Sequence, residues 1–264
     1  MRRLWSVVAV IAALCSISLA AQQPGQQGQQ GAPPPGPGGR GGPAGPPASG
    51  RAQAPFDLSG YWVSLVTDDW RYRMLTPPKG NADYLPVNAE ARRLMGEWDP
   101  AKDEAAGEAC RAYGAGGVMR LPGRLHITWE NDNTLKMDLD AGTQTRRFVF
   151  GAAPPPSEPS WQGSSTARWQ LPSGRGRGPA TTGQLVVTTN RLRPGYLRKN
   201  GLPYGANATL TEYFVKVVDD GQDYLAVTIM VDDPQYLALP YIKTYEYKKQ
   251  SDATGWAPTP CVAR

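Results

Sequence analysis

Histidine is almost absent from this chain of 264 residues, which contains only His126. Zinc sites use several nitrogen or sulfur ligands, so the sequence predicts no metal centre. Any serine nucleophile would have to use this one imidazole as its base. Gly-x-Ser-x-Gly elbows and phosphate-binding loops are also missing, and the one Gly-x-Gly-x-x-Gly spacing, at Gly36–Gly41, lies in a Gly/Pro-rich stretch without the strand that a dinucleotide fingerprint follows. These absences exclude the common hydrolase and nucleotide-dependent classes, and we expect no cofactor.

Acidic residues are missing from the first 55 positions, where the only charged side chains are Arg2, Arg3, Arg40 and Arg51. The formal net charge of +5 therefore falls to +1 for residues 56–264, once these four arginines are subtracted. A nucleic-acid-binding protein needs a basic face on its folded part. We expect no nucleic-acid partner.

A long apolar run occurs only at the N-terminus, where Arg2 and Arg3 precede the stretch from Leu4 to Ala20. A basic start, a short apolar region and a small-residue end are typical of a cleaved secretory signal. We assign residues 1–20 to a signal peptide and expect no transmembrane segment after its cleavage. The mature protein is predicted to be periplasmic or extracellular.

Cysteine is scarce: Cys15 lies within this signal, and only Cys110 and Cys261 remain. Neither has a second cysteine or a histidine at the spacing of a metal site. Exported proteins mature where thiols oxidise. The sequence therefore predicts a disulfide between Cys110 and Cys261, with two buried free thiols as the alternative.

Residues 21–55 are almost entirely Gln, Gly, Pro, Ala and Ser. Such a composition has too few apolar side chains to form a core. It predicts a disordered arm, which could contact the cell envelope. The remaining residues, 56–264, have a length suited to one domain.

A helical segment is predicted at about 88–113, near the start of this domain. Asn88 and Asp99 are favoured N-cap residues, and Pro100 suits the first position of a second helix. Gly114 is a typical residue to end it.

Short alternating segments separated by turn residues fill the rest of the domain, a pattern typical of a sandwich or barrel. A closed meander is favoured because it removes exposed strand edges. We therefore predict an all-β fold with two short helices, an antiparallel meander barrel of about nine strands. After an opening strand near Trp62, the expected strands are Leu125–Glu130, Leu135–Asp140, Gln144–Phe150, Ser164–Gln170, Gln184–Asn190, Thr209–Val218, Tyr224–Val231 and Lys243–Lys249.

The register of the first hairpin follows from its alternation. Directly opposed residues of an antiparallel pair share a face of the sheet. Keeping the apolar residues together requires Trp129 to oppose Leu135 and Ile127 to oppose Met137. His126 is then predicted to lie opposite Asp138.

Several weak motifs occur in one order between Met119 and Cys261: Trp-x-Gly…Trp, Leu-Val-Val-x-Thr, Thr-Glu-aromatic, Asp-Pro-x-Tyr and a late cysteine. In this order they resemble a widespread family of secreted bacterial β-rich proteins. The opening Gly-x-Trp at Gly60–Trp62 is similar to the first strand of lipocalin-like barrels. The resemblance implies a secreted, lipocalin-like domain and supplies no catalytic residues. The chain departs from the family pattern between Leu171 and Gly183, where a Pro/Gly/Arg loop is inserted.

Catalysis, if present, would use His126 as a general base oriented by Asp138, or paired with Glu212. The structural alternative for His126 and Asp138 is a polar cross-strand pair on a solvent face. Glu212 should share a strand face with apolar neighbours and would be partly buried. An ion pair with Arg146 or Arg147 is therefore favoured for Glu212.

Aromatic residues are numerous, and an aromatic-lined barrel would suit a flat apolar ligand or a sugar ring. The leading hypothesis is binding of a small, largely apolar or aromatic molecule. The alternatives are a cofactor-independent isomerase or lyase and a cell-envelope interaction module. The candidate ligand-binding residues are Trp62, Tyr72, Trp129, Arg146, Trp161, Trp169, Tyr213 and Tyr236.

Overall fold

The computed structural model describes residues 48–67, 70–151, 158–173 and 181–264, without the side chains of Arg71 and Tyr72. The predicted signal peptide and most of the predicted arm lie outside these residues, and so does the side chain of Tyr72. Residues 46–264 belong to one compact unit, whose described part is presented below.

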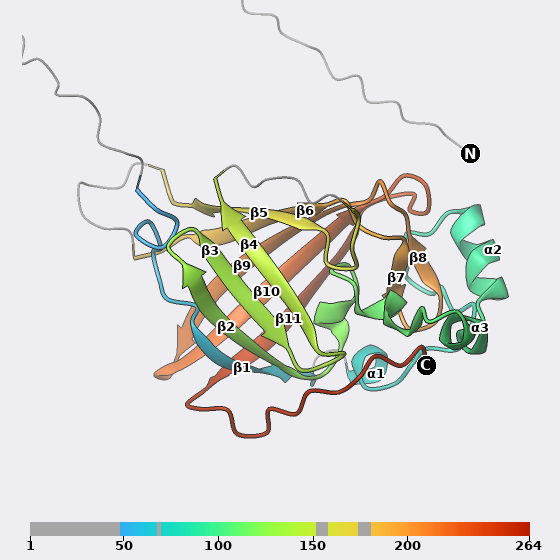
Figure 1. Cartoon of the computed structure of the whole chain (residues 1–264), viewed down its shortest axis with the longest axis horizontal. Helices are drawn as coiled ribbons and strands as arrows, with labels where there is room; N and C mark the ends of the chain where they lie inside the picture. Colours follow the sequence, from blue (N-terminus) through green and yellow to red (C-terminus); the bar gives the residue numbers. More distant parts are fainter. Residues whose placement is uncertain (1–47, 68–69, 152–157, 174–180) are drawn as a thin grey trace, which may run out of the picture. The chain divides into compact units, whose positions relative to one another are not determined.

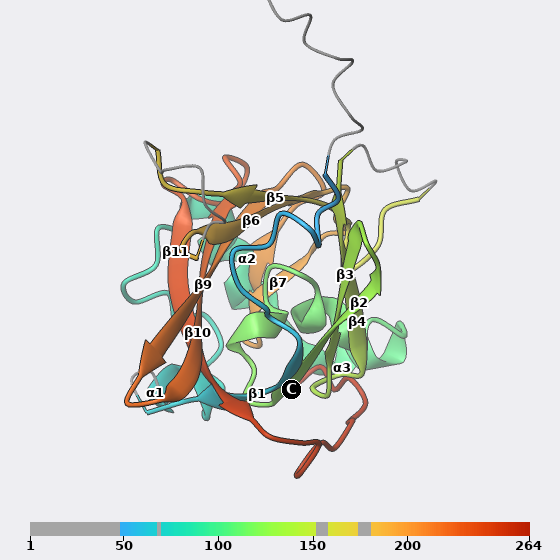
Figure 2. The same cartoon turned by 90° about the vertical axis from the view of Figure 1, so that its left-hand side faces the viewer.

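Nine strands form a closed barrel, which confirms the predicted all-β fold (Figures 1 and 2). Around the barrel the order is β1-β11-β10-β9-β6-β5-β4-β3-β2. The strands are β1 (Gly60–Leu65), β2 (Arg124–Asn131), β3 (Thr134–Leu139), β4 (Gln144–Phe150), β5 (Ser164–Gln170), β6 (Gln184–Asn190), β9 (Thr209–Asp219), β10 (Gln222–Asp232) and β11 (Tyr241–Gln250).

One pair of neighbouring strands departs from the predicted antiparallel meander. Strands β4 and β5 run parallel and are paired only from Phe148–Phe150 to Ser165–Ala167. Parallel neighbours need a connection that returns along the sheet. Strands β4 and β5 therefore point towards the same end of the barrel.

The first hairpin has the predicted register. Trp129 opposes Leu135, Ile127 opposes Met137, and His126 opposes Asp138. Because the pattern of side chains has a period of two, Ile127 and Met137 are buried in the barrel, while His126 lies on its outer face.

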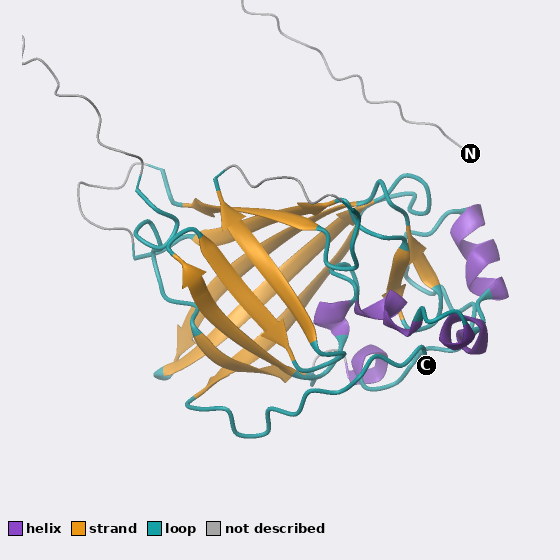
Figure 3. Cartoon of the chain, in the orientation of Figure 1, coloured by secondary structure: helices purple, strands orange, loops and turns teal. Residues whose placement is uncertain are grey.

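Helices and a small ribbon gather at one end of the barrel (Figures 1 and 3). Asn88 and Asp99 cap α2 and α3 as predicted, accepting hydrogen bonds from the backbone N–H groups of Ala91 and Ala101. The elements are α1 (Trp70–Arg73), α2 (Ala89–Glu97), α3 (Pro100–Ala105), the 3-10 helices η1 (Ala109–Tyr113) and η2 (Val118–Arg120), and the antiparallel ribbon β7 (Gly195–Arg198) and β8 (Leu202–Tyr204). In the part of the chain that is described, no helix has the length and apolar character needed to cross a membrane.

The predicted disulfide joins Cys110 of η1 to Cys261 near the C-terminus. Further contacts hold the tail beside the helices. Ala263 N–H donates to Glu104 Oε1 at 2.6 Å, and Lys199 Nζ donates to the Arg264 carbonyl at 2.9 Å. The last residues of the chain therefore pack against η1, α3 and the ribbon.

Residues 48–55, which were predicted to belong to the disordered arm, lie against the opposite end of the barrel. Trp169 Nε1 donates to the Gly50 carbonyl at 2.7 Å, and Gly50 N–H donates to Asn133 Oδ1 at 2.8 Å. A Cβ atom at Gly50 would lie 2.3 Å from the Phe150 ring, so only glycine fits there. Composition alone did not reveal these contacts, because they are made mainly by the backbone.

Candidate functional site

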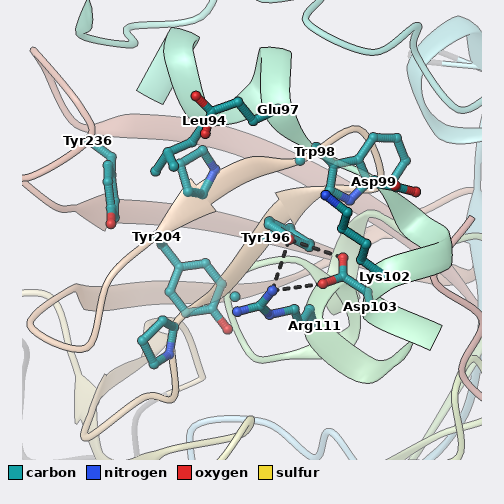
Figure 4. Close-up of a pocket in the computed structure, with 14 residues that line it drawn as sticks. Leu94, Glu97, Trp98, Asp99, Lys102, Asp103, Arg111, Tyr196, Tyr204 and Tyr236 are labelled. Atoms are coloured by element: carbon teal, nitrogen blue, oxygen red, sulfur yellow. Dashed lines mark hydrogen bonds and ion pairs between the residues drawn. The ribbon is translucent and has the colours of Figure 1, made fainter. Parts of the chain in front are cut away.

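A pocket of about 390 Å³ lies at the helical end, outside the barrel itself (Figure 4). Its walls come from α2, α3, η1 and the β7–β8 ribbon, with one residue from the segment after β10. The lining residues are Leu94, Glu97, Trp98, Asp99, Lys102, Asp103, Arg111, Pro194, Gly195, Tyr196, Gly201, Pro203, Tyr204 and Tyr236.

The short connection between two helices positions Trp98. It is the C-cap of α2 and directly precedes Asp99, the N-cap of α3, so the chain turns sharply at this point. The Trp98 side chain is buried and packs edge-on against Tyr196, with ring centroids 6.5 Å apart. Gly201 has a φ of +82°, and a Cβ atom there would lie 2.4 Å from Trp98 Cβ. Glycine at 201 therefore lets the ribbon approach the indole.

A hydrogen-bonded triad of Asp103, Arg111 and Tyr196 forms the polar wall of the pocket (Figure 4). Arg111 Nη1 donates to Asp103 Oδ1 at 2.7 Å and to the Tyr196 hydroxyl at 3.2 Å. That hydroxyl in turn donates to Asp103 Oδ2 at 3.0 Å. Burial raises the pKa of Tyr196 to about 12, so the hydroxyl stays protonated at neutral pH. The triad fixes the Tyr196 ring before any ligand arrives.

The Tyr204 ring lies in the wall of the pocket and is only 1% exposed, while its hydroxyl points away between Gly114 and Gly195. This hydroxyl is buried and has no hydrogen-bond partner among the residues that the structure describes. A buried polar group without a partner costs about 1–3 kcal/mol of stability. The ring therefore remains in place at the expense of an unsatisfied hydroxyl.

We expect Tyr204→Phe to raise the free energy of unfolding by about 1 kcal/mol at pH 7, because it removes this penalty. Burial also raises the pKa of Tyr204 well above its ordinary value. Above pH 10 the unfolded chain loses the phenolic proton while the folded chain keeps it, so the stability of the native sequence falls as pH rises. Urea denaturation at pH 7 and pH 11 should show a larger gain from Tyr204→Phe at pH 11. Equal or lower stability of the variant at both values would contradict this explanation.

The predicted ligand-binding residues do not converge on one place. Tyr236 lines the helical-end pocket, and Trp161 lines a separate hollow beside β4 and β5. Trp62 and Arg146 are buried inside the barrel, while Tyr213 lies on the outer face of β9.

Trp129 and Trp169 lie at the other end of the barrel. Both pack on Phe150, with ring centroids 5.5 and 5.7 Å away, and Phe56 packs edge-on against Trp169. These rings close that end beneath residues 48–56 and contribute to the core.

Among the proposed catalytic residues, His126 and Asp138 are opposed in register but have different partners. His126 stacks on Tyr61, with ring centroids 4.0 Å apart and planes 4° from parallel. Asp138 accepts a hydrogen bond from Thr145 Oγ1 at 2.7 Å and pairs with Lys136 Nζ at 2.9 Å. The carboxylate is thus held by these neighbours on the outer face of the barrel.

Glu212 pairs with Arg146, as favoured from the sequence, in the interior of the barrel. Two hydrogen bonds, from Arg146 Nη1 to Oε1 at 2.7 Å and from Nη2 to Oε2 at 2.5 Å, join side chains that are 0% exposed. Thr189 Oγ1 accepts a further bond from Nη2 at 3.3 Å and lies 2.8 Å from Ser165 Oγ. Both oxygens of Glu212 are therefore bound to the guanidinium, and the pair is closed to solvent.

Most of the pocket was not predicted from the sequence. Trp98, Asp103, Arg111, Tyr196 and Tyr204 are not among the candidate site residues. The available signal was the pair of turn-like segments Pro194-Gly195-Tyr196 and Pro203-Tyr204-Gly205, each placing a tyrosine beside proline and glycine. Such segments place a side chain at a loop but do not show which partner it meets.

Among the described residues, no group of three or more His, Cys, Asp or Glu side chains is arranged to hold a metal ion. Comparisons with known proteins add no further assignment. No family model matches the chain, and no curated protein or solved structure is detectably similar to it.

Proposed function

We propose that this protein is exported and binds a small ring-shaped molecule in the helical-end pocket. The observation that carries the proposal is the pocket of about 390 Å³, whose lining combines the aromatic residues Trp98, Tyr204 and Tyr236 with the fixed triad of Asp103, Arg111 and Tyr196. Ligand sites are typically hollows of about 300–1,000 Å³ with mostly apolar walls and a few precisely placed polar groups. The disulfide between Cys110 and Cys261 supports export, since such bonds persist in oxidising compartments.

The pocket is organised in advance of binding. The triad holds Tyr196, and the capped turn between α2 and α3 holds Trp98, so neither ring has to be ordered by the ligand. Pre-organised side chains reduce the entropic cost of association. A ring compound placed against the partly exposed rings of Tyr196 and Tyr236 would displace water from apolar surface without rearranging the site.

The alternative of an isomerase or lyase that uses His126 is less well supported by the hydrogen bonds and ion pairs of the candidate catalytic residues. Asp138 is bound to Thr145 and Lys136, and both oxygens of Glu212 are bound to Arg146. Among the described residues, neither carboxylate is hydrogen-bonded to His126, whose imidazole is stacked on Tyr61. General acid–base catalysis requires hydrogen-bond reach between the groups that exchange the proton. Binding therefore accounts for the pocket better than catalysis at His126.

A pair of tyrosine variants tests the proposal. A library of neutral ring compounds would be screened against the mature protein by ligand-observed NMR, and the dissociation constants of the hits measured for Tyr236→Ala and Tyr213→Ala. Loss of the Tyr236 ring should weaken binding about tenfold, since an aromatic contact contributes roughly 1–1.5 kcal/mol. Tyr213 lies on the outer face of β9, so Tyr213→Ala should bind as the native protein does.

Thermal melts of both variants would show that each remains folded. Absence of any saturable binder would refute the proposal. Hits that bind Tyr236→Ala and the native protein equally would place the ligand elsewhere.

A further inference from the structure

The charges around the helical-end pocket balance. Asp103 is paired with Arg111 at 2.7 Å, and Glu97 with Arg93 at 2.7 Å. Asp99 and Lys102 remain, one of each sign, and form no ion pair within the described part of the chain. Because these two unpaired charges have opposite signs, the pocket has no net charge that would attract an anion or a cation, and it therefore favours a neutral molecule.

The polar groups still available in the pocket include both donors and acceptors. Arg111 uses Nη1 for its two bonds, and its Nη2 has no hydrogen-bond partner among the described residues. The Tyr236 hydroxyl accepts from Gln235 Nε2 at 3.0 Å, which leaves its own proton to donate. Asp99 uses Oδ1 to cap α3 and keeps Oδ2 as an acceptor, while Lys102 Nζ is a donor.

A hydroxyl group matches such a mixed set, because it donates one hydrogen bond and accepts others. A ligand carrying a single carbonyl, which only accepts, or a single ammonium group, which only donates, would satisfy only one kind of partner. Several hydroxyls on a compact frame would satisfy donors and acceptors together. The polar side of the pocket therefore suits a polyol better than a purely aromatic molecule.

The aromatic residues of the pocket suit the apolar C–H faces of a saccharide ring. Figure 4 shows Tyr204 and Tyr236 on one side of the pocket and Trp98 and Tyr196 on the other. A pyranose ring has apolar C–H faces and a polar hydroxyl rim, and aromatic faces can bury the former while leaving the rim to polar groups. Resting on the proposed binding function, we infer that the ligand is a neutral saccharide.

The inference is tested with a defined set of probes. Binding of glucose, galactose, mannose, N-acetylglucosamine, cellobiose and maltose would be measured by saturation-transfer NMR titration of the mature protein. Tetrahydropyran-2-methanol tests the ring without its hydroxyl rim, glucuronate and glucosamine test charge, and 4-nitrophenol tests a flat aromatic molecule. We expect at least one neutral sugar to bind at least tenfold more tightly than all four comparison compounds.

Two lysine variants show whether the sugar binds in the helical-end pocket. Lys102→Met keeps most of the length of the side chain but removes its donor, and should weaken sugar binding about three- to tenfold. Lys248→Met replaces an exposed lysine on the outer face of β11 and should leave the affinity unchanged. Both variants replace exposed side chains, so their melting temperatures should match that of the native protein.

The outcomes separate this inference from the proposed function. Saturable binding of 4-nitrophenol or tetrahydropyran-2-methanol with no binding of any sugar would overturn the saccharide assignment and keep the pocket. Preference for glucuronate or glucosamine would overturn the neutral assignment. Sugar binding that Lys102→Met and Lys248→Met affect equally would also overturn the inference. No binding of any probe would count against both.

Discussion

Replacing Arg146 with methionine is expected to lower the free energy of unfolding by about 3–5 kcal/mol, because it leaves the buried carboxylate of Glu212 without its partner. Both side chains are 0% exposed and are joined by two hydrogen bonds. A carboxylate cannot recover its hydration inside the barrel, so the loss exceeds that of an ordinary hydrogen bond. Urea denaturation at neutral pH measures the difference directly.

The neighbouring residue on the same strand provides the control. Arg147 pairs with Glu130 at 2.9 Å on the outer face, where the two side chains are 54% and 39% exposed. Arg147→Met should cost no more than about 1 kcal/mol, since solvent screens an exposed pair. If Arg146→Met and Arg147→Met lower the free energy of unfolding equally, burial of the Arg146–Glu212 pair does not make its loss more costly than that of an exposed pair.

A double variant separates the strength of the pair from its net contribution. Arg146→Met combined with Glu212→Leu removes both charges and should regain most of the lost stability, since apolar replacements of buried ion pairs are often neutral or stabilising. The difference between the double variant and the sum of the single ones gives the coupling energy. A double variant as unstable as the sum would contradict direct coupling.

Alternation along strands made this pair partly predictable. Glu212 lies between Leu210 and Phe214 on the inward face of β9, as a period of two requires. The same rule places Arg146 with Phe148 inside and Arg147 outside. Alternation puts Arg146 and Arg147 on opposite faces but does not say which face turns inward, because apolar Phe148 lies on one and apolar Val149 on the other. The sequence therefore left both arginines as alternatives. Closure of the barrel brings β4 and β9 across the interior from each other.

The first hairpin was predictable for the same reason and in more detail. Apolar residues alternate on both strands, so only one register keeps Ile127 and Met137 on one face. The parallel pairing of β4 and β5 was not predictable, because alternation indicates which face a residue occupies and not the direction of the next strand. The all-β fold class could therefore be predicted from the alternation of apolar residues, whereas the parallel pairing of β4 with β5 could not.

The pocket depends on contacts between segments distant in the chain. Residues 94–111, 194–204 and 236 come together only because the helices and the β7–β8 ribbon pack at one end of the barrel. The regular pattern of the strands favoured their aromatic residues as ligand-binding candidates, yet Trp62 is part of the core and Trp129 and Trp169 pack against it. Trp98 and Tyr204 occur in short segments without periodicity, so no local rule distinguished them.

Removing the disulfide is expected to lower the free energy of unfolding by about 4–5 kcal/mol in the chain-entropy model, because the bridge closes a loop of 151 residues. Denaturation of a Cys110→Ala/Cys261→Ala variant, beside the native protein with and without reductant, would measure this loss.

The same bridge should also support the pocket. Cys110 and Arg111 are consecutive residues of η1, and the tail that Cys261 anchors contacts Glu104 and Lys199. Release of the tail should therefore loosen the position of Arg111 and weaken ligand binding, even in conditions where the variant remains folded. Reductant should reproduce both effects in the native protein and change nothing in the Cys110→Ala/Cys261→Ala variant. A variant as stable as the oxidised native protein would show that packing of the tail alone, without the covalent link, holds η1 in place.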